Sequence, residues 1–140
     1  YGIDERDCGI SNEGREQTKK IEGYWDLVIC SPMRRCRETL EASQIKYGEL
    51  KIEEMCRERR DSQCDFFYKE EAQKESVEQL LERCSQFKNL LRELRKKYNT
   101  ILVISHSGFI WHLTSFLNEN GHRIGWRLDN CQKMTFHLGP

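Results

Sequence analysis

The sequence predicts an α/β fold: a three-layer sandwich in which a mostly parallel central sheet is flanked by helices. Two short apolar runs, residues 26–30 and 101–105, have the length and composition of buried strands. Between them, a long segment repeats apolar residues at three- and four-residue steps, the spacing of a helix with one buried face. Strands that alternate with helices are typical of a parallel sheet covered on both faces.

In the first third of the chain, the sequence predicts two helices around a strand. A helix over residues 11–23 begins at a serine cap and ends at a glycine. Residues 26–30 follow as a strand. Ser31 then caps a helix over residues 31–47, with proline at its first position, where a missing N–H costs nothing. Gly48 ends this helix.

The middle of the chain contains the clearest helix. Residues 51–55 before it fit a short edge strand, and residues 57–74 fit a polar surface excursion. Ser76, with Gln79 three residues later, has the pattern of a capping box at the helix start. The apolar face of this helix consists of Val77, Leu80, Leu81, Cys84, Phe87, Leu91 and Leu94.

The last third is predicted as strand, helix and strand. The strand at 101–105 ends in a Ser-His-Ser-Gly turn. A helix over residues 109–117 follows and is closed by the Asn-Gly pair at 120–121. A final strand over residues 134–138 completes the order. A histidine at the carboxyl end of a strand lies where open α/β sheets bind ligands.

Charge and composition exclude several function classes. Lys+Arg and Asp+Glu are equal at 23 each, so no overall field draws the chain to nucleic acid or a membrane surface. The apolar runs are too short for a transmembrane span, and no secretory leader pattern is visible. We expect one cytoplasmic domain over residues 1–140, monomeric or homodimeric, with no nucleic-acid or membrane partner.

The seven cysteines are an odd number and contain no CxxC pair. Reduced thiols in a reducing compartment are therefore expected, rather than a disulfide framework. Zinc bound by Cys64, Cys84, His122 and Cys131 is an alternative, although these residues lack the short paired spacings of structural sites. We expect no metal and no cofactor.

Several short motifs, taken in order, resemble those of the histidine phosphatase superfamily, the phosphoglycerate mutase-like clan. Residues 31–39 resemble its S-P-x-x-R-x-x-x-T segment, and residues 10–17 resemble its L-T-x-x-G-x-x-Q segment. Residues 57–59 resemble the block that holds its acidic residue. The other blocks in family order are Glu75-Ser76, residues 105–108 and residues 128–131. The resemblance runs from about residue 7 to the end and implies a phosphoglycerate mutase-like fold that handles phosphoryl groups.

The resemblance implies a phosphate site on Arg35, His106 and Ser107. A phosphoryl dianion needs fixed donors, and arginine supplies a rigid charged fork. In the family pattern Arg35 holds phosphoryl oxygens and His106 polarises the transferring group. Ser107 stands where glycine is commonest, which leaves Gly108 for close backbone approach. The competing interpretation is a solvated arginine face at residues 34–37 and a hydrogen-bonded core histidine.

Glu58 is the candidate proton donor to the leaving group. That role needs burial or negative charge to favour the protonated carboxyl, whereas the adjacent arginines favour the ionised form. A plain surface glutamate is the alternative. Residues 66–68, Phe-Phe-Tyr, fit either a lid or a packing segment. The histidines without such context are His112, His122 and His137, and of these His112, on a predicted helix, and His137, in a predicted strand, are expected to be structural.

The nucleophilic histidine of the family stands in an R-H-G motif, and no R-H-G occurs in this sequence. The chain starts at Tyr1 inside a polar segment without an initiator Met. One expectation is that a strand ending in Arg-His-Gly precedes Tyr1, so that the domain is N-terminally incomplete here. The other is a shortened relative that has lost the nucleophile.

These observations give one leading hypothesis and three rivals. The first is a phosphatase acting on a small phosphorylated metabolite or phosphoprotein through a phosphohistidine. The short excursion at 57–74 leaves little room for a cap domain, which favours a phosphatase over a mutase. The mutase is therefore the first rival. The other two are a catalytically silent module that binds a phosphorylated partner, and an α/β interaction domain without a phosphate site.

Overall fold

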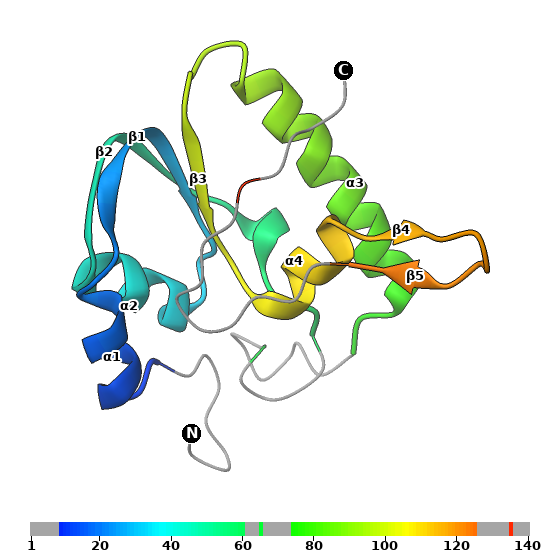
Figure 1. Cartoon of the computed structure of the whole chain (residues 1–140), viewed down its shortest axis with the longest axis horizontal. Helices are drawn as coiled ribbons and strands as arrows, with labels where there is room; N and C mark the ends of the chain where they lie inside the picture. Colours follow the sequence, from blue (N-terminus) through cyan, green and yellow to red (C-terminus); the bar gives the residue numbers. More distant parts are fainter. Residues whose placement is uncertain (1–8, 61–64, 66–73, 126–134, 136–140) are drawn as a thin grey trace.

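A computed structural model of the chain describes residues 9–60, 65, 74–125 and 135, and its central element is a three-stranded parallel sheet. The strands β1 (Glu22–Cys30), β2 (Gln44–Ile52) and β3 (Ile101–Ile104) lie in the order β2-β1-β3 (Figure 1). The middle strand β1 is buried over its last four residues, all apolar. A continuous apolar run of this kind is expected for a strand covered on both faces.

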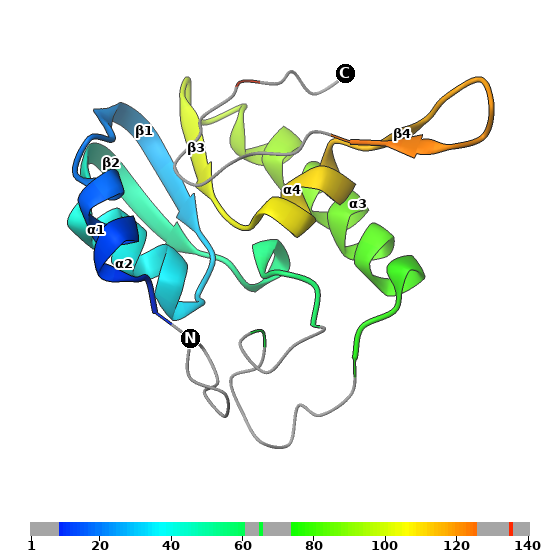
Figure 2. The same ribbon diagram turned by 60° about the horizontal axis from the view of Figure 1, so that its bottom comes forward.

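Helices cover both faces of the sheet. The helices α1 (Asn12–Thr18) and α2 (Arg34–Ala42) lie on one face, and α3 (Val77–Leu94) and α4 (Ser107–Leu113) lie on the other (Figure 2). These layers confirm the α/β sandwich predicted from the sequence. Within the described ranges, no helix combines the length and apolar character that spanning a membrane requires.

The main core lies between the sheet and the α3–α4 layer. Successive side chains of a strand alternate between its faces, so Leu27 and Ile29 of β1 point together into this core. Phe87 of α3 and Phe109 of α4 meet there edge to face, with ring centroids 5.6 Å apart. The other buried members are Cys56, Leu80, Cys84, Leu91 and Leu113.

The carboxyl ends of β1 and β3 lie side by side. Cys30 is in register with Ile104, and the Ser31 amide donates to the Ile104 carbonyl over 3.0 Å. From β1 the chain leaves through α2 on one face, whereas it leaves β3 through α4 on the other. Neighbouring parallel strands whose connections diverge in this way form the crevice where α/β sheets place ligands.

The prediction for α3 is confirmed except at Val77, the first residue of the predicted face, which is exposed. Ser76 Oγ accepts from the Gln79 amide over 3.1 Å, and Gln79 Oε1 accepts from the Ser76 amide over 2.9 Å, so the capping box is present. The buried residues of the predicted face are Leu80, Cys84, Phe87 and Leu91. The strand predicted at 101–105 is β3, and Ser11 caps α1 through the Gly14 amide.

The helix predicted over residues 31–47 is wrong at both ends. Met33, not Ser31, is the N-cap of α2, because the Ser31 hydroxyl is engaged by His106 and by the Met33 amide. The helix ends at Ala42, and Gly48 lies within β2. Residues 44–52 form a mostly exposed edge strand whose backbone pairs with β1, and this pairing overrides their helical propensity.

Two other elements also differ from the prediction in their boundaries. The first helix ends at Thr18 instead of Gly23, because β1 already begins at Glu22. The edge strand predicted at 51–55 is the end of β2, followed by a 3₁₀ turn, η1 (Glu54–Cys56).

The helix predicted over 109–117 ends at Leu113. Residues Phe116–Leu117 (β4) instead pair antiparallel with Arg123–Ile124 (β5) in a hairpin. Apart from Thr135, the strand predicted at 134–138 lies outside the described residues, as do residues 66–68 and 128–131.

Candidate functional site

The carboxyl ends of β1 and β3 bring three polar side chains together. Ser31 directly follows β1, Arg35 lies in the first turn of α2, and His106 is the N-cap residue of α4. Arg35 Nε donates to His106 Nδ1 over 3.2 Å, and His106 Nε2 lies 2.9 Å from Ser31 Oγ. The structure therefore places Arg35 and His106, both selected from the sequence, in direct contact.

The contacts of His106 define its protonation. Because Nδ1 accepts from Arg35, the ring proton is on Nε2 and is donated to Ser31 Oγ. The side chain is buried, and this desolvation, followed by the charges of Arg35, Arg83 and Arg57, holds the pKa of His106 well below its usual range. The imidazole is neutral at pH 7, and its one N–H is the donor in the contact with Ser31.

Asp65 completes this cluster and was not selected from the sequence. Its Oδ1 accepts from Arg35 Nη2 over 2.9 Å, and its backbone carbonyl accepts from Arg57 Nη2 over 2.9 Å. Asp65 and Arg57 are both buried, although the sequence placed them in a surface excursion. Arg35 therefore binds one anionic oxygen already, which is the type of contact that a phosphoryl oxygen would make.

Glu58 lies at the start of α4. Its Oε2 accepts from the Gly108 amide over 3.0 Å, and its Oε1 accepts from the Arg59 amide over 2.9 Å. A Cβ atom at position 108 would lie 2.6 Å from Glu58 Oε1, so only glycine leaves room for this approach. Glu58 is partly buried. The residue that its carboxylate binds, Gly108, lies two residues after His106 in the sequence.

The arginines beside Glu58 bind other groups. Arg57 Nη1 lies 3.3 Å from a Glu54 carboxylate oxygen, and Arg59 Nε donates to the Glu75 carbonyl over 2.9 Å. Arg60 Nη2 lies 3.7 Å from Glu75 Oε2. The positive charge that the sequence places next to Glu58 is thus directed toward these acceptors.

The other sequence candidates lie at the edge of the site or outside it. Ser107 is exposed at the first position of α4, so its part in binding stays a prediction. Arg34 binds Glu38 over 2.6 Å, and Arg37 donates to the Pro32 carbonyl over 2.9 Å, both on the exposed side of α2.

Neither described histidine outside the cluster joins the site. His112 Nδ1 bonds the Gly108 carbonyl over 2.8 Å within α4. His122 lies exposed in the β4–β5 hairpin, where its amide donates to Asn118 Oδ1 over 2.9 Å.

The cysteines of the described ranges are buried free thiols. Cys36 Sγ lies 3.5 Å from His106 Nε2, but burial raises the pKa of this thiol far above its ordinary value, so it is not a thiolate nucleophile. Burial likewise raises the pKa of Cys84 to about 11. Of the residues considered for zinc, Cys84 packs in the apolar core, and Cys64 and Cys131 lie outside the described residues.

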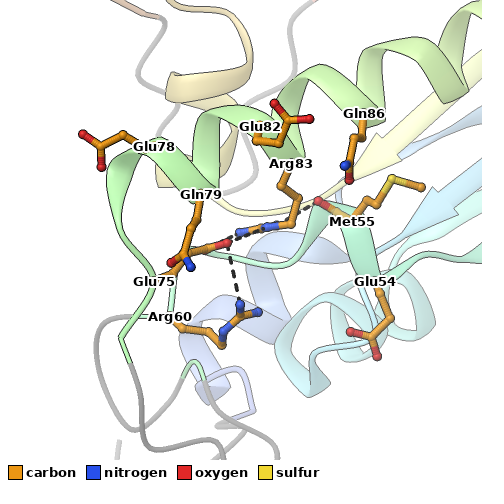
Figure 3. Close-up of a pocket in the computed structure, with 9 residues that line it drawn as sticks. All are labelled: Glu54, Met55, Arg60, Glu75, Glu78, Gln79, Glu82, Arg83 and Gln86. Atoms are coloured by element: carbon orange, nitrogen blue, oxygen red, sulfur yellow. Dashed lines mark hydrogen bonds and ion pairs between the residues drawn. The ribbon is translucent and has the colours of Figure 1, made fainter.

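A separate pocket of about 550 Å³ lies between η1 and the start of α3 (Figure 3). Its walls are mostly charged or amide side chains. The lining residues are Glu54, Met55, Arg60, Glu75, Glu78, Gln79, Glu82, Arg83 and Gln86. Arg35, His106 and Asp65 do not line this pocket, so it is distinct from the Arg35–His106 cluster, although Arg83 on its wall is one of the charges that act on His106.

A protein-family match covers much of the chain. The family model described as histidine phosphatase superfamily (branch 1) matches residues 45–138, which is more than half of the chain. Glu58 and His106 lie inside the matched range, whereas Ser31 and Arg35 precede it. No curated protein matches the chain. The superfamily consists mainly of phosphatases and mutases, which transfer phosphoryl groups. The chain therefore belongs to the histidine phosphatase superfamily.

Proposed function

We propose that this chain is the phosphate-binding and proton-donating part of a phosphatase that cleaves phosphomonoesters through a phosphohistidine. The observation that supports it best is the contact between Arg35 and His106 at adjacent strand ends. One supplies a fixed cation and the other a neutral N–H donor in a largely buried setting. Such preorganised donors stabilise the charge that develops on a transferring phosphoryl group.

In the proposed mechanism, an imidazole nitrogen attacks phosphorus while Arg35 and His106 bind the phosphoryl oxygens. The N–P bond forms as the ester P–O bond breaks, and Glu58 gives its proton to the leaving oxygen. Water then attacks the phosphohistidine, returns a proton to Glu58 and releases inorganic phosphate. The phosphoryl oxygens displace Asp65 Oδ1 from Arg35 during binding.

The nucleophilic imidazole is expected from a segment N-terminal to Tyr1, because no R-H-G motif occurs in the 140 residues. The edge of β3 that faces away from β1 supports this expectation. Among the described strands β3 pairs with β1 alone. A strand edge presents backbone N–H and C=O groups that a neighbouring strand can pair, so a further strand beside β3 fits this edge.

The substrate class in this proposal is a small phosphorylated metabolite or a phosphoprotein. The free thiols of Cys30, Cys36, Cys56 and Cys84 support a location in the reducing cytoplasm. The mutase variant of the chemistry would need a second phosphate acceptor at the same cluster.

The experiment is hydrolysis of p-nitrophenyl phosphate by the full-length protein, with acid-labile phosphate trapped on histidine by rapid quenching. We expect turnover in the wild type, and its loss in His106→Ala and Arg35→Ala. A full-length protein that binds phosphate without turnover or trapped phosphohistidine would refute the enzymatic proposal.

The second candidate is a phosphate-binding module of the same fold. It is favoured by one observation, that Arg35 and His106 are present in a sequence without R-H-G. Orthovanadate or phosphate that raises the melting temperature without turnover would support it, since a ligand of the native state stabilises the fold. Failure of both anions to raise the melting temperature would refute both candidates.

A further inference from the structure

Arg83 of α3 lies against the segment that leads to Glu58. Its Nη1 donates to the Met55 carbonyl over 2.8 Å and to the Arg57 carbonyl over 2.6 Å. Its Nη2 reaches the Glu58 carbonyl at 3.5 Å. One guanidinium therefore fixes the backbone of residues 55–58, which lies outside any strand.

The remaining donors of Arg83 are held by Glu75. Arg83 Nε donates to Glu75 Oε2 over 3.0 Å, and Nη2 donates to Glu75 Oε1 over 2.7 Å. Both side chains are largely buried. Burial raises the pKa of Glu75, but the hydrogen bonds and charge of Arg83 and the charge of Arg60 outweigh it, so the pKa lies below its ordinary value. The pair is ionised at neutral pH.

Arg83 also contacts the residue that follows Gly108 in the first turn of α4. Its guanidinium carbon lies 5.0 Å from the centroid of the Phe109 ring, a distance typical of a cation–π contact. Phe109 directly follows Gly108, whose amide donates to Glu58 Oε2. Arg83 thus touches both the backbone that holds Glu58 and the helix turn that binds its carboxylate.

We propose that Arg83, held by Glu75, is a positioning residue that places the Glu58 carboxylate at the first turn of α4. Glu58 itself makes two backbone hydrogen bonds, and both depend on the relative placement of residues 57–59 and α4. Arg83 contacts both of these segments from α3. The role of Glu58 as acid rests on the proposed function, whereas its placement by Arg83 does not.

The geometry distinguishes arginine from lysine at this position. Figure 3 shows Arg83 between Met55 and Glu75 on the wall of the pocket, with Arg60 on the far side of Glu75. The planar guanidinium of Arg83 donates to the Met55 and Arg57 carbonyl groups and to the Glu75 carboxylate. A lysine ammonium has fewer N–H donors and is not planar, so it does not reproduce this set of bonds. Arg83→Lys keeps the charge while removing the bonds to the carbonyl groups.

The test is the ¹H–¹⁵N spectrum of the full-length protein, read at the Gly108 amide. That signal is identified by its disappearance in Gly108→Ala, and Glu58→Ala gives its position without the carboxylate. We expect Arg83→Lys and Glu75→Gln to move the Gly108 signal upfield toward that position. Arg92→Lys is the matched control, because Arg92 bonds Asn89 near the other end of the same helix. A Gly108 signal that stays in place in both Arg83→Lys and Glu75→Gln, yet moves in Glu58→Ala, would overturn the proposal.

A second measurement separates positioning from general loss of structure. Loss of a proton donor slows a poor leaving group more than a good one, because the former needs the proton in the transition state. We expect Arg83→Lys to lower kcat on an alkyl phosphate by about tenfold, and on p-nitrophenyl phosphate by less than about threefold. Equal losses on both substrates would contradict a positioning role. A wild-type protein without turnover would refute the proposed function. The Gly108 amide signal would then be the only test of whether Arg83 places the Glu58 carboxylate.

Discussion

Arg35 Nε donates to His106 Nδ1 over 3.2 Å, so the guanidinium and the imidazole form a pair in which only one partner is charged. A protonated imidazole would present a hydrogen at Nδ1 to the arginine N–H. Burial first, and then this pairing, keep His106 neutral, with its single N–H directed at Ser31 Oγ. A cation and a neutral donor can bind the same phosphoryl group without repelling each other.

The first prediction concerns pH and His106. The lowered pKa of His106 means that the unfolded chain binds a proton near pH 6.5 while the native protein does not. The unfolded state then holds more protons, so the free energy of unfolding falls by about 1.4 kcal/mol per pH unit below roughly 6.5, until the native pKa is reached. Urea unfolding at pH 5.5 and 7.5 measures this slope.

His106→Gln removes the titrating group and flattens that slope. The lowered pKa of Glu75 acts in the same direction but in a separate window, because its stabilising effect is lost only as pH falls below its ordinary value of 4.5. An unchanged slope between pH 5.5 and 7.5 in His106→Gln would show that His106 is not the source.

The second prediction concerns Asp65. Its carboxylate binds Arg35 and carries the same sign of charge as a phosphoryl group, so it competes with an incoming anion. We expect Asp65→Asn to tighten binding of inorganic phosphate by about tenfold, or about 1.4 kcal/mol. The variant should also lose about 1–3 kcal/mol of stability, because a largely buried charged pair is broken.

Titration calorimetry measures the phosphate affinity of Asp65→Asn. Glu38→Gln is the control, since Glu38 binds Arg34 on the same helix and is not in the Arg35–His106 cluster. Weaker phosphate binding in Asp65→Asn than in the wild type would mean that Asp65 orients Arg35 for the anion instead of competing with it.

The third prediction uses the glycine at the start of α4. A methyl group at Gly108 would lie within 2.8 Å of both Glu58 carboxylate oxygens and would displace them. We expect Gly108→Ala to lower kcat by roughly 100-fold, the usual contribution of a positioned acid. Melting temperature should change little, because the gain in helix propensity, up to about 1 kcal/mol, offsets the lost hydrogen bond.

Gly14→Ala is the matched control for this substitution. Gly14 lies in α1, where the added methyl group would be 3.3 Å from its nearest neighbour, Ser11 Oγ. Its kcat should equal that of the wild type. A normal kcat in Gly108→Ala would exclude Glu58 as the proton donor in its present position.

The fourth prediction concerns the aromatic pair behind the site. Phe87 is fully buried and meets Phe109 edge to face at 72°. Phe87→Ala should lower the free energy of unfolding by about 3–5 kcal/mol. Phe116→Ala, at a side chain 56% exposed, should change it by less than about 0.5 kcal/mol. Chemical denaturation checks both, and comparable losses would contradict the core described here.

The sequence was most informative where burial is periodic. The α3 face and its capping box follow from spacing alone, and β3 and the buried second half of β1 follow from apolar runs, whereas residues 22–25 of β1 were not predicted as strand. Residues 44–52 contain Lys, Tyr, Gly and Glu in a mostly exposed edge strand, so no apolar alternation marks them. Their strand conformation comes from hydrogen bonds to β1, which local sequence does not record.

The site was predictable in part for a related reason. Arg35, Glu58 and His106 were found through motif resemblance, and the structure brings Arg35 and His106 into contact. Asp65 and Arg83 have no motif signal. Asp65 binds Arg35, which is 30 residues away in the sequence, and Arg83 binds the backbone of the segment that leads to Glu58, 25 or more residues away. Pairing over such separations is a property of the folded topology.

The pairing of β1 with β3 also determines when this site exists. Arg35 and His106 are 71 residues apart, and they meet only after the segment containing α3 has crossed the sheet and β3 has paired with β1. Closing a loop of that length is entropically costly and is typical of slow folding steps. On the ribosome, a nascent chain that has not yet emerged beyond His106 cannot form the Arg35–His106 contact, so this cluster assembles only after both strand ends have left the exit tunnel.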